Sequence, residues 1–139
     1  MDVAHVIQSA LAPVFLISGV GVMLGVLTNR LARIVDRARV WENEAEREAQ
    51  RSADLEERLQ VLARRARYIS SAITMCAISA LLVALVVVAL FANAFLAVQL
   101  SALIALLFVA AMLALTGAFL TFLIEVRIAT AAIRIGQPR

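Results

Sequence analysis

The residue best placed to do chemistry in this chain is Glu125, the acid that closes the last long apolar run. Four arginines flank the apolar runs at the same membrane surface as Glu125: Arg30 and Arg33 after the first run, Arg67 before the second and Arg127 after the third. A carboxylate at the edge of the hydrocarbon is costly unless it is paired. We therefore expect Glu125 to form an ion cluster with one or more of these arginines. The residue types allow two roles for it, a structural anchor or a gate and ion site.

Other candidates for chemistry are weaker. Asp2 and His5 lie near the N-terminus and offer only two ligands, fewer than a metal site needs. Cys76 is the single cysteine, which excludes an intramolecular disulfide, and its apolar surroundings indicate a packing role. No nucleophile and base stand out as a pair. The sequence therefore predicts no enzyme, no cofactor and no bound metal.

The elements that must position Glu125 are long apolar helices. Hydrophobic residues make up 63% of the 139 residues, far above a soluble composition. Three runs, residues 7–28, 69–92 and 95–124, each reach the ~20 residues that a helix needs to cross a bilayer. Residues 26–116 contain no glycine or proline to break a helix. The sequence predicts an all-α membrane protein in which residues 1–139 form one domain with three transmembrane helices.

The distribution of charge predicts the orientation of these helices. Residues 29–68 hold ten Arg and eight acids, whereas the connection near Asn93 carries no charge. The positive-inside rule then places residues 29–68 and the C-terminus in the cytoplasm and the N-terminus outside. A basic pI of about 10.4 in a membrane protein indicates cytoplasmic loops that face anionic lipid. Because the arginines alternate with acids and form no basic face, we do not expect nucleic-acid binding.

The charged segment between the first two runs has a regular apolar pattern. Apolar residues recur at alternating steps of three and four, the heptad spacing of packed helices. The two halves must return to one membrane, so we expect residues 29–68 to form an antiparallel coiled-coil hairpin that extends the first two helices. The seam residues are Leu27, Leu31, Ile34, Ala38, Trp41 and Ala45, followed by Leu55, Leu59, Leu62, Ala66, Ile69 and Ile73.

Two helices carry stripes of small residues. Small side chains let helix backbones approach closely in lipid, where no hydrophobic effect drives helices together. The stripes predict either packing within the chain or contact between copies in a homo-oligomer, and the two are not exclusive. Their residues are Ser18, Gly21, Gly25 and Thr28 in the first run and Gly117 and Thr121 in the third.

One face of the first helix has the sequence of a pore lining. Its polar ends flank an apolar middle, as in a channel with a hydrophobic constriction. Ordinary packing is the alternative explanation of the same face. The residues are Gln8, Phe15, Gly19, Val22 and Asn29.

Three segments resemble a known family. Residues 12–21, residues 27–39 and residues 122–129 are similar to the bacterial membrane family catalogued as domain of unknown function 2721. The resemblance covers nearly the whole chain, and residues 29–39 are its most specific part. It implies a protein of the bacterial inner membrane with three spans, and it implies no activity and no catalytic residues.

Two functions are consistent with these patterns. The first is an oligomeric membrane protein that forms a pore or conduit for ions or small solutes. The second is a structural or interaction protein whose cytoplasmic hairpin docks a protein partner or organises the membrane.

Overall fold

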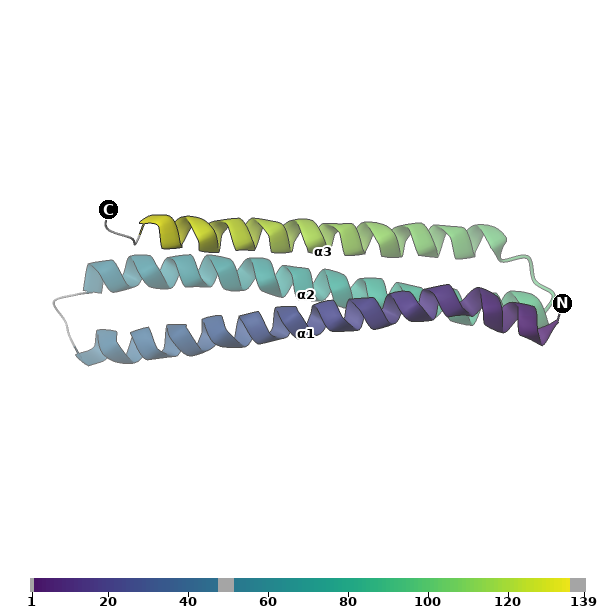
Figure 1. Ribbon diagram of the computed structural model, residues 1–139, viewed down its shortest axis with the longest axis horizontal. Coiled ribbons are helices and arrows are strands. Elements are labelled where there is room, and N and C mark those ends of the chain that lie inside the picture. The colour runs from purple at the N-terminus through teal and green to yellow at the C-terminus, as the bar shows by residue number, and fades with distance from the viewer. Residues whose placement is uncertain (1, 48–51, 136–139) are drawn as a thin grey trace.

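The computed structural model describes residues 2–47 and 52–135, with side chains placed for residues 2–44 and 56–131. This part of the chain is entirely helical apart from short connections and contains no strand. The helices are α1 (Val3–Arg47), α2 (Ser52–Phe95) and α3 (Ser101–Ile135) (Figure 1). Each is long and apolar enough to cross a membrane, as the three apolar runs predict.

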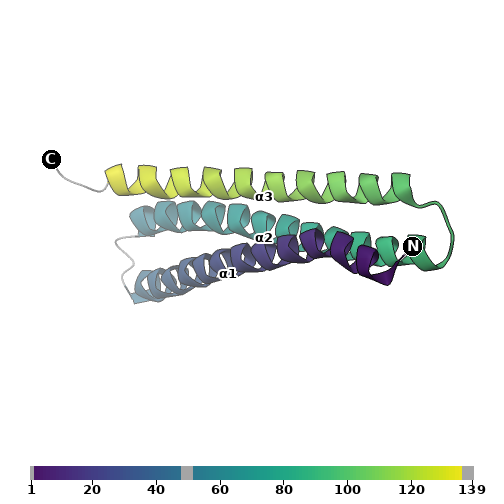
Figure 2. The same ribbon diagram turned by 45° about the vertical axis from the view of Figure 1, so that its right-hand side comes forward.

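The helices form an open layer and not a closed bundle. α2 lies in the middle and packs along both neighbours, whereas α1 and α3 hardly touch each other. α2 runs antiparallel to α1 and to α3, and both views show it between them (Figures 1 and 2). As a result, one side of α1 and one side of α3 have no protein neighbour within the protomer.

Pro13 lies well inside α1, ten residues after the first residue of the helix. A proline there lacks the N–H that would bond to the preceding turn, which bends a helix. Figure 1 shows the axis of α1 changing direction in its N-terminal part.

The core follows the heptad seam that the sequence predicts. Leu27 and Ile34 on α1 and Leu62 and Ile69 on α2 are buried in one cluster, and they stand seven residues apart on each helix. The cluster continues into the apolar half of the layer through Cys76, which packs as expected. The side chains of Ala45 and Leu55, the seam residues nearest the reversal, lie outside those described.

The connection between α2 and α3 differs from the expectation. The sequence places the break near Asn93 and the start of the third helix at Phe95, but α2 continues through Phe95 and α3 begins at Ser101. Ala97 has a φ of 51°, a left-handed conformation that ends helices and is usually taken by glycine. Asn93 Oδ1 accepts a hydrogen bond from the Leu100 amide at 3.0 Å, which closes the turn. Without Gly or Pro at this turn, hydropathy alone could not locate it.

Candidate functional site

Glu125 on α3 is fully buried, and both of its carboxylate oxygens accept hydrogen bonds from arginines. Arg30 on α1 donates from Nη2 at 2.8 Å and from Nε at 3.2 Å to Oε2. Arg65 on α2 donates from Nε to Oε1 at 3.1 Å. Among the described side chains, no buried polar atom is left without a partner. A buried charge is stable only when opposite charges and hydrogen bonds compensate for the lost water, and the two arginines supply both to this carboxylate.

The Arg30–Glu125–Arg65 cluster ties all three helices together. α1 and α3 are otherwise almost without contact, so Arg30 is their main bridge. The Arg30 guanidinium also lies over the ring of Phe122, 5.3 Å from its centre, in cation–π geometry. The side chains of Arg30 and Arg65 are 34% and 17% exposed, so part of each guanidinium still reaches the surface. With two cations and one anion, the cluster keeps a net positive charge.

The sequence predicts one partner of Glu125 correctly and misses the other. Arg30 is in the cluster as expected. Arg33, Arg67 and Arg127 are exposed, and none of them forms a salt bridge to Glu125 in the part of the chain that the structure describes. Depth in the membrane does not distinguish these arginines from one another, because the helix face also decides which of them can reach Glu125.

The heptad seam contains the signal that would have identified Arg65. Arg30 follows Leu27 by three residues and precedes Ile34 by four, so it lies on the packed side of α1. Arg65 stands in the same relation to Leu62 and Ile69 on α2. Arg67 is two residues further along and therefore points to the far side of the helix.

The two small-residue stripes have different surroundings. Ser18, Gly21, Gly25 and Thr28 on α1 are all exposed, and a methyl group added at either glycine would have no heavy atom within 4 Å. The hydroxyls of Ser18 and Thr28 donate to carbonyls of their own helix, those of Val14 and Leu24. This stripe makes no contact that depends on its small size within the protomer.

The stripe on α3 is used for packing within the chain. A methyl group at Gly117 would lie 3.0 Å from Sδ of Met75 on α2. Thr121 is half-buried beside the same sulfur, with Oγ1 3.9 Å away. Nearby, the buried Ser79 hydroxyl on α2 donates to the Ala111 carbonyl on α3 at 2.9 Å. The small residues of α3 thus allow α2 to approach closely.

The suggested pore face of α1 is likewise uncovered. Its two largest side chains, Phe15 and Val22, are 72% and 70% exposed. Gly19 has nothing within 4 Å of the position where a methyl group would stand, and Gln8 and Asn29 are exposed at the two ends of the face. The face is available to lipid or to another copy of the chain.

Asp2 and His5 are the two residues near the N-terminus that could bind a metal. Asp2 and His5 are both exposed, and among the described residues no group of three His, Cys, Asp or Glu side chains could hold a metal ion.

Three helices that can each cross a membrane, joined by a buried ion cluster where their apolar parts end, define an α-helical membrane protein. The chain belongs to the family described as "Protein of unknown function (DUF2721)", whose sequence model matches residues 10–135. This confirms the resemblance seen in the sequence. No curated protein and no solved structure matches the chain.

Proposed function

We propose that this protein assembles through α1 into a homo-oligomer in the bacterial inner membrane and forms a conduit for ions or small solutes. The observation that carries the proposal is the uncovered face of α1. This side of the helix holds two neighbouring stripes. One contains Gly21 and Gly25, where an added methyl group would meet no heavy atom within 4 Å, and the other runs from Gln8 to Asn29 and is polar at both ends. Glycines spaced by four favour close contact between helices in lipid, and α1 makes no such contact within its own chain.

The length of the face fits a membrane passage. Gln8 and Asn29 are separated by 21 residues, about 31 Å of helix, which matches the thickness of the hydrocarbon core. Phe15, Gly19 and Val22 lie between them and would form an apolar constriction. Around a symmetry axis, one helix from each copy would supply the whole lining, as a closed cyclic assembly requires.

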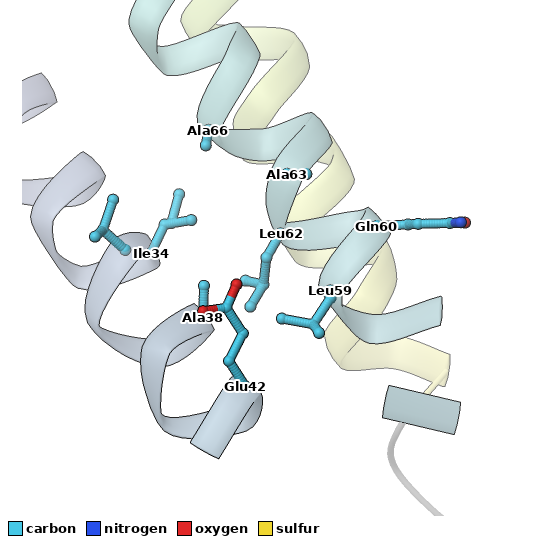
Figure 3. Close-up of a pocket in the computed structure, with 9 residues that line it drawn as sticks. Ile34, Ala38, Glu42, Leu59, Gln60, Leu62, Ala63 and Ala66 are labelled. Carbon is cyan, nitrogen blue, oxygen red and sulfur yellow. The ribbon is translucent and has the colours of Figure 1, made fainter. Parts of the chain in front are cut away.

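A second candidate function rests on the charged ends of α1 and α2, which we place in the cytoplasm as a coiled-coil hairpin. An apolar groove of about 330 Å³ opens between these two arms. Figure 3 shows Ile34 and Ala38 facing Leu62 and Ala66 across it, with Glu42 at its edge and Gln60 directed away. A protein partner that inserts an apolar side chain there would make this an interaction protein. In both versions the N-terminus lies outside and residues 29–68 and the C-terminus lie in the cytoplasm.

Cysteine cross-linking tests the assembly. The chain has one native cysteine, so Cys76→Ala provides a cysteine-free background. Phe15→Cys and Val22→Cys should each form disulfide-linked dimers in membranes, because equivalent positions approach one another around an axis. Leu113→Cys is the matched control, since Leu113 is about as exposed as Phe15 and Val22 but lies on α3, which does not line the axis in this proposal. Equal cross-linking at all three positions would reject α1 as the interface.

Flux through liposomes then separates the two functions. A conduit requires ion or solute leakage that depends on the protein and that falls when Val22 is replaced by Trp. An assembled protein that conducts nothing, yet loses binding of a cytoplasmic protein when Ala38 and Ala66 are replaced by Leu, would support the interaction role instead.

A further inference from the structure

Charge is sharply divided along the long axis of this molecule. Residues 3–29 and 69–124 contain no Asp, Glu, Lys or Arg, so the hydrocarbon region ends where the charges begin. Within about five residues of that edge the chain has six arginines and a single acid, Glu125, a net charge of +5. The arginines are Arg30, Arg33, Arg64, Arg65, Arg67 and Arg127.

The arms beyond this edge have the opposite charge. Residues 34–63 contain five Arg and eight acids, a net charge of −3. A generally basic segment would be attracted to an anionic membrane along its whole length, whereas these arms would be repelled from it. Net positive charge is therefore concentrated where the apolar runs end. We call this position along the long axis the boundary level.

The Arg30–Glu125–Arg65 cluster holds that level in register across the three helices. It occupies Glu125 completely and retains a net positive charge. Arg33, Arg64, Arg67 and Arg127 stand within three residues of a cluster member along the chain, and their side chains are exposed. Within the described residues no carboxylate lies within 4.0 Å of any of these four arginines. Their guanidinium groups are therefore available to bind an anion from outside the chain.

On the apolar side of these arginines, the surface of α3 is suited to contact with lipid acyl chains. On α3, Leu120, Leu123 and Ile124 are exposed and stand on the turns that precede Arg127. A helix places residues three, four and seven positions apart on one side, so these apolar residues and Arg127 form a continuous strip. An apolar strip capped by a guanidinium matches a phospholipid, with its acyl chain below and its phosphate above.

We propose that the boundary arginines form a binding surface for the phosphate headgroups of anionic phospholipids, held in register by the Arg30–Glu125–Arg65 cluster. Guanidinium groups bind phosphate oxygens through paired hydrogen bonds, which a neutral headgroup with its own cation weakens by competition. The bound lipids fix the depth of the helices, while the acidic arms stand away from the membrane. This inference is independent of whether the protein conducts.

The matched variants are two double substitutions that each remove two positive charges. Arg33→Gln with Arg67→Gln alters the boundary, and Arg37→Gln with Arg39→Gln alters α1 further out. The second pair stands about 14–17 Å beyond Thr28 along the helix, well past the screening distance of about 8 Å at physiological salt. All four arginines are exposed, so neither pair disturbs a buried contact.

The experiment is native mass spectrometry of the full chain in neutral detergent, titrated with phosphatidylglycerol or with phosphatidylcholine of the same acyl chains. We expect the wild type to bind phosphatidylglycerol more tightly. The boundary pair should lose about fivefold in affinity for each arginine removed, and the outer pair less than twofold in total. Circular dichroism should show equal helix content in all three proteins.

Three outcomes would overturn the proposal. One is equal affinity of the wild type for the two lipids. Another is an equal loss in both double variants, which would indicate attraction by net charge alone. The third is displacement of phosphatidylglycerol by millimolar inorganic phosphate, which would identify a site for a soluble anion and not for a lipid.

Discussion

The small-residue stripes of α1 and α3 look alike in sequence and have opposite surroundings in the structure. On α3, Gly117 lies against Met75, and the buried Glu125 follows Thr121, the last residue of the stripe, by four residues. On α1, Gly21 and Gly25 are exposed, and a methyl group added at either would meet no heavy atom within 4 Å. A stripe of this kind thus predicts that a helix can be approached closely, but it does not say by which partner. The difference separates a stripe that packs within the chain from a stripe that stays uncovered in it.

The largest effect is expected at the end of the α3 stripe. Glu125→Gln removes the carboxylate that pairs with both Arg30 and Arg65, and we expect a loss of about 3 kcal/mol in the free energy of unfolding. Glu125→Asp should lose less, because it keeps the charge. Both can be measured by denaturation in detergent. If Glu125→Gln left stability unchanged and altered ion flux in liposomes, the cluster would be a gate and not an anchor.

The next effect tests the close approach of α3 to α2. Gly117→Leu would force a bulky side chain into Met75, where even a methyl group stands at 3.0 Å. We expect a loss of about 1–3 kcal/mol in protomer stability, the usual cost of overpacking. Adding Met75→Ala should restore part of this loss, because it frees space at the same place. Failure of the second substitution to compensate would mean that the contact does not limit the helix spacing.

A smaller effect compares two serines. Ser79→Ala removes the buried hydrogen bond from α2 to the Ala111 carbonyl, and we expect a loss of about 0.6 kcal/mol, typical of such bonds in membranes. Ser18→Ala on α1 removes only a bond to its own helix and should change stability less. Thermal unfolding of the two variants side by side measures the difference. The reverse order would contradict the assignment of α3 as the packed stripe.

The smallest effect on the protomer, and the most informative for assembly, is expected at the α1 stripe. Gly21→Leu with Gly25→Leu meets open space, and Leu is the better helix former, so the free energy of unfolding of the monomer should not fall. If α1 joins the copies, the same double variant should run as a smaller particle in mild detergent. A wild-type protein that is already monomeric would reject the oligomer altogether.

The local features of this protein follow from short-range sequence patterns. Three long apolar runs predict three helices, and the heptad spacing of Leu27, Ile34, Leu62 and Ile69 predicts the buried seam. A lone acid at the end of an apolar run predicts an ion pair at Glu125. These predictions succeed because periodicity and burial cost act on each helix separately.

Three features were decided only by the tertiary structure. The small-residue stripes of α1 and α3 are equally suited by composition to contact with α2. Which of them α2 covers depends on how the three helices are arranged, with α2 in the middle of the layer. The meeting of Glu125 with both Arg30 and Arg65 depends on where α3 packs against the other two helices, which the seam of α1 and α2 does not specify. The turn after Phe95 depends on a left-handed alanine and an asparagine side chain, which no propensity marks. In each case the sequence by itself determined which groups needed a partner, and packing between helices chose the partner, because that choice depends on which faces meet in space.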